Sequence, residues 1–136
     1  MKVLITGGSG LIGSRLTQQL KNEGIEVVHL TRSANSKNGV KTYVWDWARN
    51  KIDERCFEGV THIVHLAGEG IADKPWTMER KRNIVKSRVL TARLIETKVR
   101  ELNIPIQAFI SASGIGYYGA ITTETIFDEA SERGND

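Results

Sequence analysis

The first thirteen residues run from a short apolar segment straight into a glycine-rich turn. Residues 3–5, Val-Leu-Ile, are wholly apolar, which is typical of a strand buried on both faces of a parallel sheet. Gly7, Gly10 and Gly13 follow at a spacing of three, and a helical pattern starts at once. Because glycines lack Cβ atoms, the turn can approach a diphosphate closely, and the first N–H groups of the helix then point at its charge. Strand, turn and helix in this order predict a dinucleotide-binding fold.

Predicted strands alternate with predicted helices along the rest of the chain. Apolar runs favour further strands over residues 25–30, 42–45, 62–67 and 106–111, with a short element over residues 52–57. This alternation implies parallel strand pairing and right-handed crossovers. We therefore expect an α/β protein with a three-layer Rossmann fold, in which a doubly wound parallel sheet of about five strands carries helices on both faces.

Two amphipathic helices are predicted between these strands. The first carries an apolar stripe at helical spacing, made of Ile12, Leu16 and Leu20. Gly24 can end this helix. The second helix is capped by Thr77 and extends from Met78 to about Leu102. Its expected apolar face consists of Val85, Val89, Ala92, Ile95, Val99 and Leu102.

Composition limits the functional classes that remain. The net charge of +3 is modest, so neither nucleic acid nor a membrane surface is an expected partner. Cys56 is the only cysteine, which excludes an intrachain disulfide and favours a small buried residue in a reducing compartment. No apolar run approaches the roughly 20 residues that span a bilayer, and the N-terminus has no signal-peptide organisation. We expect a cytoplasmic protein.

The three histidines and the basic residues have ordinary interpretations. His29, His62 and His65 lie in predicted strands without cysteines or carboxylates at ligand spacing, so we expect polar strand residues and no metal site. Basic residues gather over positions 80–88 of the long helix. We interpret most of them as the solvated face opposite the apolar stripe.

The end of the second strand bears on the choice of dinucleotide. Residues 30–33 read Leu-Thr-Arg-Ser and lack the carboxylate that usually takes the ribose hydroxyls in NAD-binding proteins. Arg32 offers a planar fork suited to a phosphate, and Thr31 adds a hydroxyl. This pattern favours NADP(H), whose extra 2′-phosphate needs a cation, over NAD(H). The alternative is a solvated loop arginine.

Two other strand ends supply candidate cofactor contacts. Asp46 follows the third strand and is either an acceptor for the exocyclic amine of adenine or a turn-forming aspartate. Leu66, Ala67 and Gly68 end the fourth strand. They are predicted to pass beneath the cofactor, because small residues let the backbone come close.

Hydroxyl groups gather after the fifth strand. Ser111, Ser113, Tyr117 and Tyr118 lie where a substrate would meet the nicotinamide, because ligands of open α/β sheets bind beyond the carboxyl ends of the strands. The alternative is a glycine-rich loop whose tyrosines pack over the sheet edge.

The chain of 136 residues is long enough for one domain with a buried core. We expect residues 1–136 to form an NAD(P)-binding Rossmann domain, with residues 113–136 as the loop-rich start of a substrate-side region. That last stretch is rich in glycine, threonine and acidic residues. Since nothing after the fifth strand resembles a substrate domain, we expect a truncated chain whose substrate lobe is absent.

Four motifs together resemble a known family. They are residues 6–13 (TGGSGLIG), residues 65–72 (HLAGEGIA) with the following Trp76-Thr77, Ser87-Arg88, and residues 111–119 (SASGIGYYG). These motifs are similar to those of extended short-chain dehydrogenases/reductases, the NAD-dependent epimerase/dehydratase superfamily. More narrowly, they resemble its atypical "epimerase family protein" branch of sugar-nucleotide epimerase-like proteins. The resemblance covers essentially the whole chain and matches the N-terminal half of a longer protein.

The resemblance implies an NADP(H)-binding Rossmann domain and assigns its cofactor contacts. They fall on the glycine turn, the strand ends and the long helix: Gly7, Gly10, Leu11, Ile12, Gly13, Thr31, Arg32, Leu66, Ala67 and Arg88. Asp46, Gly68 and Ser111 complete the expected cofactor set. Ser113 matches the serine that holds the substrate's reacting oxygen in ordinary members, and Tyr117 is the candidate catalytic acid.

One departure from the family pattern separates two functional hypotheses. Typical members use a tyrosine followed four residues later by a lysine that lowers its pKa. Here the residues four after the tyrosines are Trp47, Ile121 and Thr122. The first hypothesis is an NADP(H)-dependent oxidoreductase or epimerase-like enzyme acting on a nucleotide sugar or another carbonyl or alcohol substrate. The alternative is a non-catalytic NADP(H)-binding regulatory or redox-responsive module. We expect a small-molecule partner and leave a homodimer open.

Overall fold

The computed structural model describes residues 1–34, 39–112, 114–120 and 124–135. Its strands are β1 (Lys2–Thr6), β2 (Glu26–Thr31), β3 (Lys41–Asp46), β4 (Lys51–Ile52), β5 (His62–His65) and β6 (Ala108–Ser111). Its helices are α1 (Leu11–Asn22) and α2 (Met78–Glu101), with three short 3-10 helices, η1 (Trp47–Arg49), η2 (Glu54–Phe57) and η3 (Ile115–Tyr118). Every predicted strand and helix is present, and most bounds agree within two residues.

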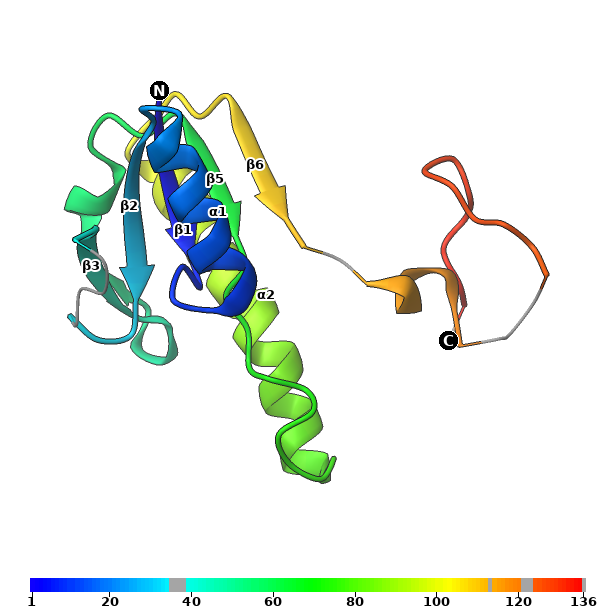
Figure 1. The fold of residues 1–136 in the computed structure, drawn as a ribbon. Helices are drawn as coiled ribbons and strands as arrows, with labels where there is room; N and C mark the ends of the chain where they lie inside the picture. Colours follow the sequence, from blue (N-terminus) through cyan, green and yellow to red (C-terminus); the bar gives the residue numbers. More distant parts are fainter. Residues whose placement is uncertain (35–38, 113, 121–123, 136) are drawn as a thin grey trace.

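The strands form one sheet in the order β4-β3-β2-β1-β5-β6 (Figure 1). The five longer strands run parallel to one another, as predicted. β4 pairs with β3 in the antiparallel sense, and this two-residue edge strand was not predicted. The chain leaves β1 toward β2 on one side and later returns to β5 on the other side of β1. The strand order therefore reverses at β1, and such a switch point is where open α/β sheets bind ligands.

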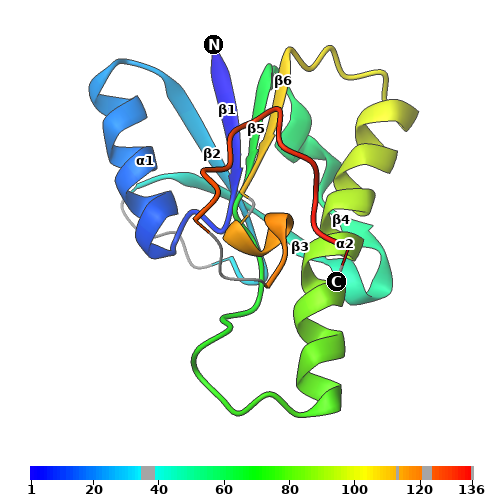
Figure 2. The same cartoon turned by 90° about the vertical axis from the view of Figure 1, so that its right-hand side faces the viewer.

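The two long helices cover opposite faces of the sheet (Figure 2). On the α1 side, Val3, Ile5 and Val27 point away from the sheet and pack with the partly buried leucines of α1. On the α2 side, Leu4 and Val28 belong to a larger cluster that includes apolar residues of α2. Adjacent strand residues thus serve opposite layers, because side chains alternate across a strand. This is the predicted three-layer, doubly wound arrangement.

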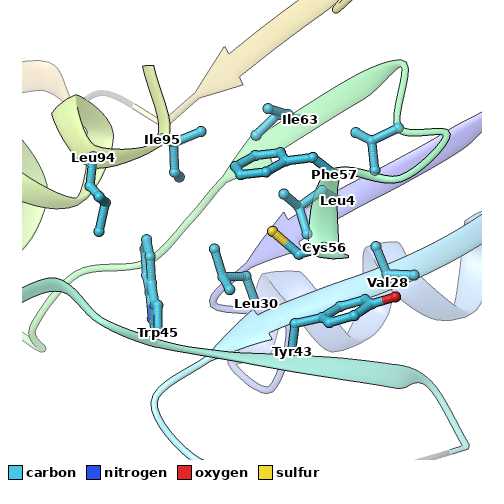
Figure 3. Close-up of a cluster of buried hydrophobic side chains, with 11 residues drawn as sticks. Leu4, Val28, Leu30, Tyr43, Trp45, Cys56, Phe57, Ile63, Leu94 and Ile95 are labelled. Carbon is cyan, nitrogen blue, oxygen red and sulfur yellow. The ribbon is translucent and has the colours of Figure 1, made fainter. Parts of the chain in front are cut away.

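The larger core lies under α2 and is closed at one side by η2. Phe57 and Cys56 of η2 are 2% and 0% exposed and pack with Leu4, Tyr43 and Ile63 (Figure 3). Burial raises the pKa of the Cys56 thiol to about 12. The sole cysteine is therefore an inert core residue, as its sequence context indicated.

The apolar stripe predicted for α1 is wrong at Ile12, whose side chain is 66% exposed. The face that packs on the sheet contains Gly13 and Thr17, both buried. A Cβ at Gly13 would lie 2.3 Å from the carbonyl oxygen of Gly7. The helix starts so close to the glycine turn that its first turn contributes backbone, rather than large apolar side chains, to the contact.

The apolar face predicted for α2 is wrong at Val85, Val89 and Leu102, which are 59%, 41% and 39% exposed. The other three predicted residues are buried or partly buried. Near the middle of the helix, Ser87 and Thr91 face the sheet instead and are buried. Their hydroxyls can be buried because each donates a hydrogen bond to a carbonyl of the preceding turn. Val89 instead lines an open groove beside β6, with Ala92, Val99 and Phe109.

We expect Thr77→Ala to lower the free energy of unfolding by about 1 kcal/mol. The Thr77 hydroxyl caps α2 by accepting a hydrogen bond from the backbone N–H of Arg80 at 3.1 Å, as the sequence predicted. Urea denaturation of the purified protein measures the loss. Thr97→Ala, an exposed site inside the same helix, is the matched control and should not destabilise. Equal losses in the two variants would contradict a capping role.

The chain leaves the sheet after β6. In Figure 1 the segment from η3 onward lies apart from the sheet and the two long helices. Phe109 and Ile110 of β6 are 43% and 54% exposed, since nothing among the described residues covers this edge strand. None of the described helices has the length and apolar character needed to cross a membrane.

Candidate functional site

The glycine turn after β1 is shaped by its own backbone. Gly7 has a φ of +71°, and a Cβ there would lie 2.9 Å from the backbone carbonyl of Leu66. The Gly10 N–H donates to the Gly7 carbonyl at 3.0 Å and closes the turn. Gly7 and Gly13 are therefore required by the fold itself. Gly10 differs, because a Cβ there would meet only the Gly7 oxygen at 3.3 Å among the described atoms, so it borders open space.

The N-terminus of α1 presents unpaired donors beside this turn. Gly10 is its N-cap, no described side chain caps it, and its first turn has no acidic residue. The N–H groups of the first turn of a helix have no partner within the helix, and they carry the positive end of its dipole. Leu11 and Ile12 provide two of these N–H groups, and their side chains point to solvent, 91% and 66% exposed. The start of α1 thus offers bare amides to an anion.

A cavity of about 420 Å³ lies at the carboxyl ends of β1, β2, β3 and β5, bounded on one side by α2. Its size falls within the range of about 300–1,000 Å³ found for small-molecule sites. The predicted residues that line it are Gly7, Gly10, Thr31, Arg32, Leu66, Ala67 and Gly68. The structure therefore brings together the glycine turn, the second strand end and the fourth strand end, three segments far apart in the sequence.

The candidate residues at the ends of β2 and β3 differ in their relation to the cavity. Thr31 hydroxyl donates to the Ser33 carbonyl at 2.5 Å, which fixes the turn that carries Arg32. Asp46 does not line the cavity. Its carboxylate accepts from the backbone N–H of Arg49 at 3.2 Å and pairs with the guanidinium of the same residue at 2.9 Å. The structure thus gives Asp46 the turn-forming contacts that were one of its two interpretations.

Two arginines of α2 hold the loop that follows β5. Arg80 pairs with the carboxylate of Glu69 and donates to the Gly70 carbonyl at 2.6 Å. Arg88 donates to the Glu69 carbonyl at 3.1 Å, and its guanidinium lies over Gly68, where a Cβ would come within 3.0 Å. Arg88 does not line the cavity itself. It lies behind the loop and sets the loop's position.

Of the two residues predicted for catalysis, Tyr117 does not line the cavity. Ser113 lies outside the described residues. Ser111 is the last residue of β6, and Tyr117 is 54% exposed on η3 and contacts the Tyr118 ring edge-on. The Tyr118 hydroxyl donates to the Asp128 carbonyl at 2.9 Å. η3 therefore packs with its own segment, and Figure 1 places that segment away from the glycine turn.

His29 and His65 are buried on the sheet, 7% and 4% exposed, and each binds a threonine of the helix above it. Burial lowers the pKa of both imidazoles, and for His65 the backbone carbonyl of Arg88 acts weakly in the opposite direction. Both rings are therefore neutral near pH 7. Throughout the described ranges, no three histidine, cysteine or carboxylate side chains are grouped as metal ligands would be.

Acid should destabilise the protein through these two histidines. Their pKa values lie below the ordinary 6.5 in the folded state, so the unfolded chain binds protons first as the pH falls. The stability contributed by the neutral rings is complete above pH 6.5 and is lost as the pH falls through the folded pKa values. The slope that each histidine contributes is at most about 1.4 kcal/mol per pH unit. Urea denaturation between pH 5 and 7.5 should show a shallower dependence of the free energy of unfolding on pH in His29→Gln than in the wild type, and an unchanged slope would contradict this.

Sequence reasoning missed several residues of the cavity wall. Trp45, Trp47, Glu69, Lys74, Arg80, Ser87 and Thr91 line it. One signal was available for the last two: hydroxyl residues four apart on a helix share a face. The tryptophans and the loop after β5 carried no such signal.

The strand order that reverses at β1 and the glycine turn that borders the cavity at the start of α1 are features of a Rossmann fold. A family model described as "NAD dependent epimerase/dehydratase family" matches residues 3–135. The chain belongs to this family.

Three known proteins illustrate the similarity. An epimerase family protein of Staphylococcus aureus is 30% identical over 115 residues, which are 85% of this chain and 38% of that protein. The crystal structure of human epimerase family protein SDR39U1 (isoform 2) with NADPH matches the whole chain and 44% of its own, with a TM-score of 0.77 and 27% identity. A nucleoside-diphosphate sugar epimerase from Corynebacterium glutamicum also matches the whole chain, at 34% identity, a TM-score of 0.77 and 27% of its own length. The chain thus spans less than half the length of these relatives.

Proposed function

We propose that residues 1–136 are the coenzyme-binding domain of an NAD(P)-dependent, epimerase-like oxidoreductase that prefers NADP(H). One observation carries this proposal: Gly10, the N-cap of α1, lines the same cavity as Arg32, whereas Leu11, Ile12 and Gly13 follow it without lining the cavity. The amides of Leu11 and Ile12 would hold the diphosphate, because they lack partners and carry the positive end of the helix dipole. Residues 113–136 would then begin the substrate-side region.

The residues present fit such a coenzyme. The cavity volume of about 420 Å³ suits a small molecule, and a Cβ at Gly10 would project into space that a diphosphate needs. Thr31 and Arg32 stand on the rim where the second strand ends, the place at which ribose-phosphate discrimination occurs in this fold. Arg32 supplies a planar set of donors for a 2′-phosphate. The human relative was crystallised with NADPH, which supports the same preference.

When bound, a nicotinamide coenzyme supplies or accepts the hydride of the reaction. The chain's own residues would bind and orient it. Leu66 and Ala67 offer a narrow floor at the end of β5, and Glu69 and Gly70 border the cavity through a loop that Arg80 fixes. Ser113 is proposed to hold the oxygen of a carbonyl or alcohol substrate, with Tyr117 as the acid. A nucleotide sugar is the proposed substrate class, since the bacterial relative is described as a nucleoside-diphosphate sugar epimerase.

Parallel calorimetric titrations with NADPH and NADH test the binding proposal. We expect NADPH to bind at least about tenfold more tightly, equivalent to 1.4 kcal/mol. Equal affinities would contradict the preference for NADP(H) and leave the coenzyme site standing. Binding of neither coenzyme by the folded protein would overturn the proposed function.

A non-catalytic NADP(H)-binding module is the second candidate. The observation that favours it is the missing lysine four residues after each tyrosine, which removes the usual means of lowering a tyrosine pKa. Hydride exchange with a panel of sugar nucleotides and simple carbonyl compounds separates the two candidates. Coenzyme binding without exchange on any substrate would favour the module, and turnover of one compound would favour the enzyme.

A further inference from the structure

A continuous chain of buried hydrogen bonds runs beneath the cavity from β1 to α2. His65 of β5 lies in the middle, with its Nδ1 2.8 Å from the Thr6 hydroxyl and its Nε2 3.2 Å from the Thr91 hydroxyl. The Thr6 oxygen is also 3.1 Å from the backbone nitrogen of Ala67, and the Thr91 oxygen is 2.6 Å from the Ser87 carbonyl. The three side chains that form this hydrogen-bond chain are all buried, Thr6 and Thr91 almost completely.

The partners at the two ends fix the direction of every hydrogen bond in this chain. A threonine hydroxyl has one proton, and Thr91 gives it to a carbonyl that can only accept. Thr91 must therefore accept from His65, so Nε2 carries the ring proton. In a neutral imidazole Nδ1 is then an acceptor. Thr6 donates its proton to Nδ1, and its lone pair accepts from the Ala67 N–H. The Thr91 proton is shared between the Ser87 carbonyl and the Arg88 carbonyl, which lies 3.0 Å away, and both of these can only accept.

The groups joined in this way belong to three walls of the cavity. Thr6 immediately precedes Gly7 of the glycine turn, Ala67 belongs to the floor, and Thr91 lines the α2 side. Ser87, at the far end of the chain, also accepts a hydrogen bond from the backbone N–H of Glu69 at 3.0 Å. A shift of any of these walls would break a buried hydrogen bond, which costs more than an exposed one.

We propose that His65 is a positioning residue whose neutral, Nε2-protonated ring holds the glycine turn, the end of β5 and α2 at the spacing that the coenzyme requires. This proposal rests on the proposed function only for the identity of the ligand. The hydrogen-bond chain itself is defined by the residues and needs no ligand. His65 itself does not line the cavity and acts through Thr6 and Thr91.

The opposite face of the sheet repeats the arrangement. Nε2 of His29 in β2 lies 2.9 Å from the hydroxyl oxygen of Thr17 in α1. The Thr17 hydroxyl donates its proton to the Gly13 carbonyl at 2.6 Å. The same reasoning places a proton on Nε2 of His29. Its ring also lies directly under Gly8, where a Cβ would come within 2.4 Å. One histidine–threonine pair thus fixes each helix beside the glycine turn.

The tautomer is the first test, because it needs no coenzyme. Nitrogen-15 NMR of histidine-labelled protein at pH 7.5 distinguishes the two neutral tautomers, and His65→Gln assigns the signal. We expect Nε2–H for His65 and for His29. A proton on Nδ1 of His65 would reverse the chain and overturn the proposal, whether or not the protein binds a coenzyme.

The second test asks whether the chain acts on coenzyme binding. Thr91→Val keeps the shape of the side chain and removes the hydroxyl, so we expect affinity for both NADPH and NADH to fall about tenfold. Thr42→Val is the matched control, since the partly buried Thr42 hydroxyl in β3 donates to the carbonyl of Val40, just before the strand, and neither residue lines the cavity. It should bind as the wild type does. Equal affinity of Thr91→Val and the control, in folded proteins, would overturn the positioning role alone.

Two replacements of His65 separate positioning from simple packing. Gln can place its amide nitrogen near the Nε2 position, so His65→Gln should recover part of the affinity that His65→Leu loses. If the Leu variant binds as well as the wild type does, the proposal fails. If the wild type binds neither coenzyme, the proposed function and the positioning role are both overturned. The tautomer measurement would then still test the direction of the hydrogen bonds.

A pH profile adds a readout that packing would not change. A protonated His65 would donate from both nitrogens. The Thr6 hydroxyl would then accept from His65 as well as from Ala67, and its own proton would have no acceptor. Coenzyme affinity should therefore fall more steeply below pH 6.5 in the wild type than in His65→Gln. Trp45 and Phe109 place uncharged rings against His65. The charged side chains on the neighbouring elements include Arg80 and Arg88 of α2 and Glu69 of the adjoining loop, and all three remain in both proteins. Parallel profiles for the two proteins would count against the proposal.

Discussion

Gly10→Val is expected to fold normally and to bind NADPH and NADH at least about a hundredfold more weakly, a loss of about 2.7 kcal/mol. Gly10 has φ −76° and ψ 176°, which any residue adopts, so valine introduces no backbone strain. Its Cβ would meet only the Gly7 carbonyl oxygen at 3.3 Å among the described atoms. The branched side chain would instead fill the space in front of the bare amides of α1, where the diphosphate is proposed to lie.

Calorimetric titration measures this effect, with thermal unfolding as a check on the fold. Gly116→Val is the matched control, because a Cβ at that exposed glycine meets nothing within 4 Å. This control should bind both coenzymes as the wild type does. A folded Gly10→Val protein with unchanged affinity would show that the glycine turn is only a tight bend. Gly13→Val would not serve, because its Cβ would collide with the turn and a loss of binding would merely report misfolding.

Arg32→Asp is expected to weaken NADPH binding by about thirtyfold or more and to change NADH binding by less than about threefold. A charge-assisted hydrogen bond contributes about 1.5–3 kcal/mol, and the substitution also places a carboxylate against the 2′-phosphate. NADH lacks that phosphate, and an acidic residue at this strand end suits the ribose hydroxyls of NAD(H). The expected outcome is therefore a change in coenzyme preference rather than a general loss.

Arg100→Asp controls for the change in net charge. Arg100 lies near the C-terminus of α2, where its guanidinium pairs with Glu96 at 2.9 Å, and it does not line the cavity. Its substitution should leave the ratio of the two dissociation constants unchanged. If Arg32→Asp weakens NADPH and NADH equally, Arg32 does not contact the 2′-phosphate, and the solvated loop arginine is the correct interpretation.

Local sequence patterns predicted the elements well, and the reason differs from element to element. The strand at residues 3–5 is apolar because both of its faces are covered, so periodicity was not needed to find it. Thr77 was recognisable because a threonine hydroxyl satisfies an otherwise unpaired N–H at a helix start. β4 escaped detection, because two residues paired at a sheet edge leave no pattern.

The helix faces were predicted less well, for a reason that lies outside each helix. Periodicity counts apolar side chains, and in α2 it selected Val85 and Val89. His65 of the sheet lies beneath this part of the helix. The buried position is therefore occupied by Thr91, whose hydroxyl bonds both the imidazole and a carbonyl of its own helix. Ile12 of α1 was misplaced because the helix starts on a turn that leaves no room for a side chain.

The amino-acid sequence by itself determined the order of strands and helices, the glycine turn and the family, since each depends on residues close together in the chain. Only the tertiary structure decided which of the candidate residues share a cavity. It placed Thr31 and Arg32 opposite the loop after β5, gave Asp46 an arginine partner and joined Thr6, His65 and Thr91 in one hydrogen-bond chain. These relations depend on strand order and on the burial of polar groups. Both arise from contacts between segments that are distant in the sequence, where no local pattern can record them.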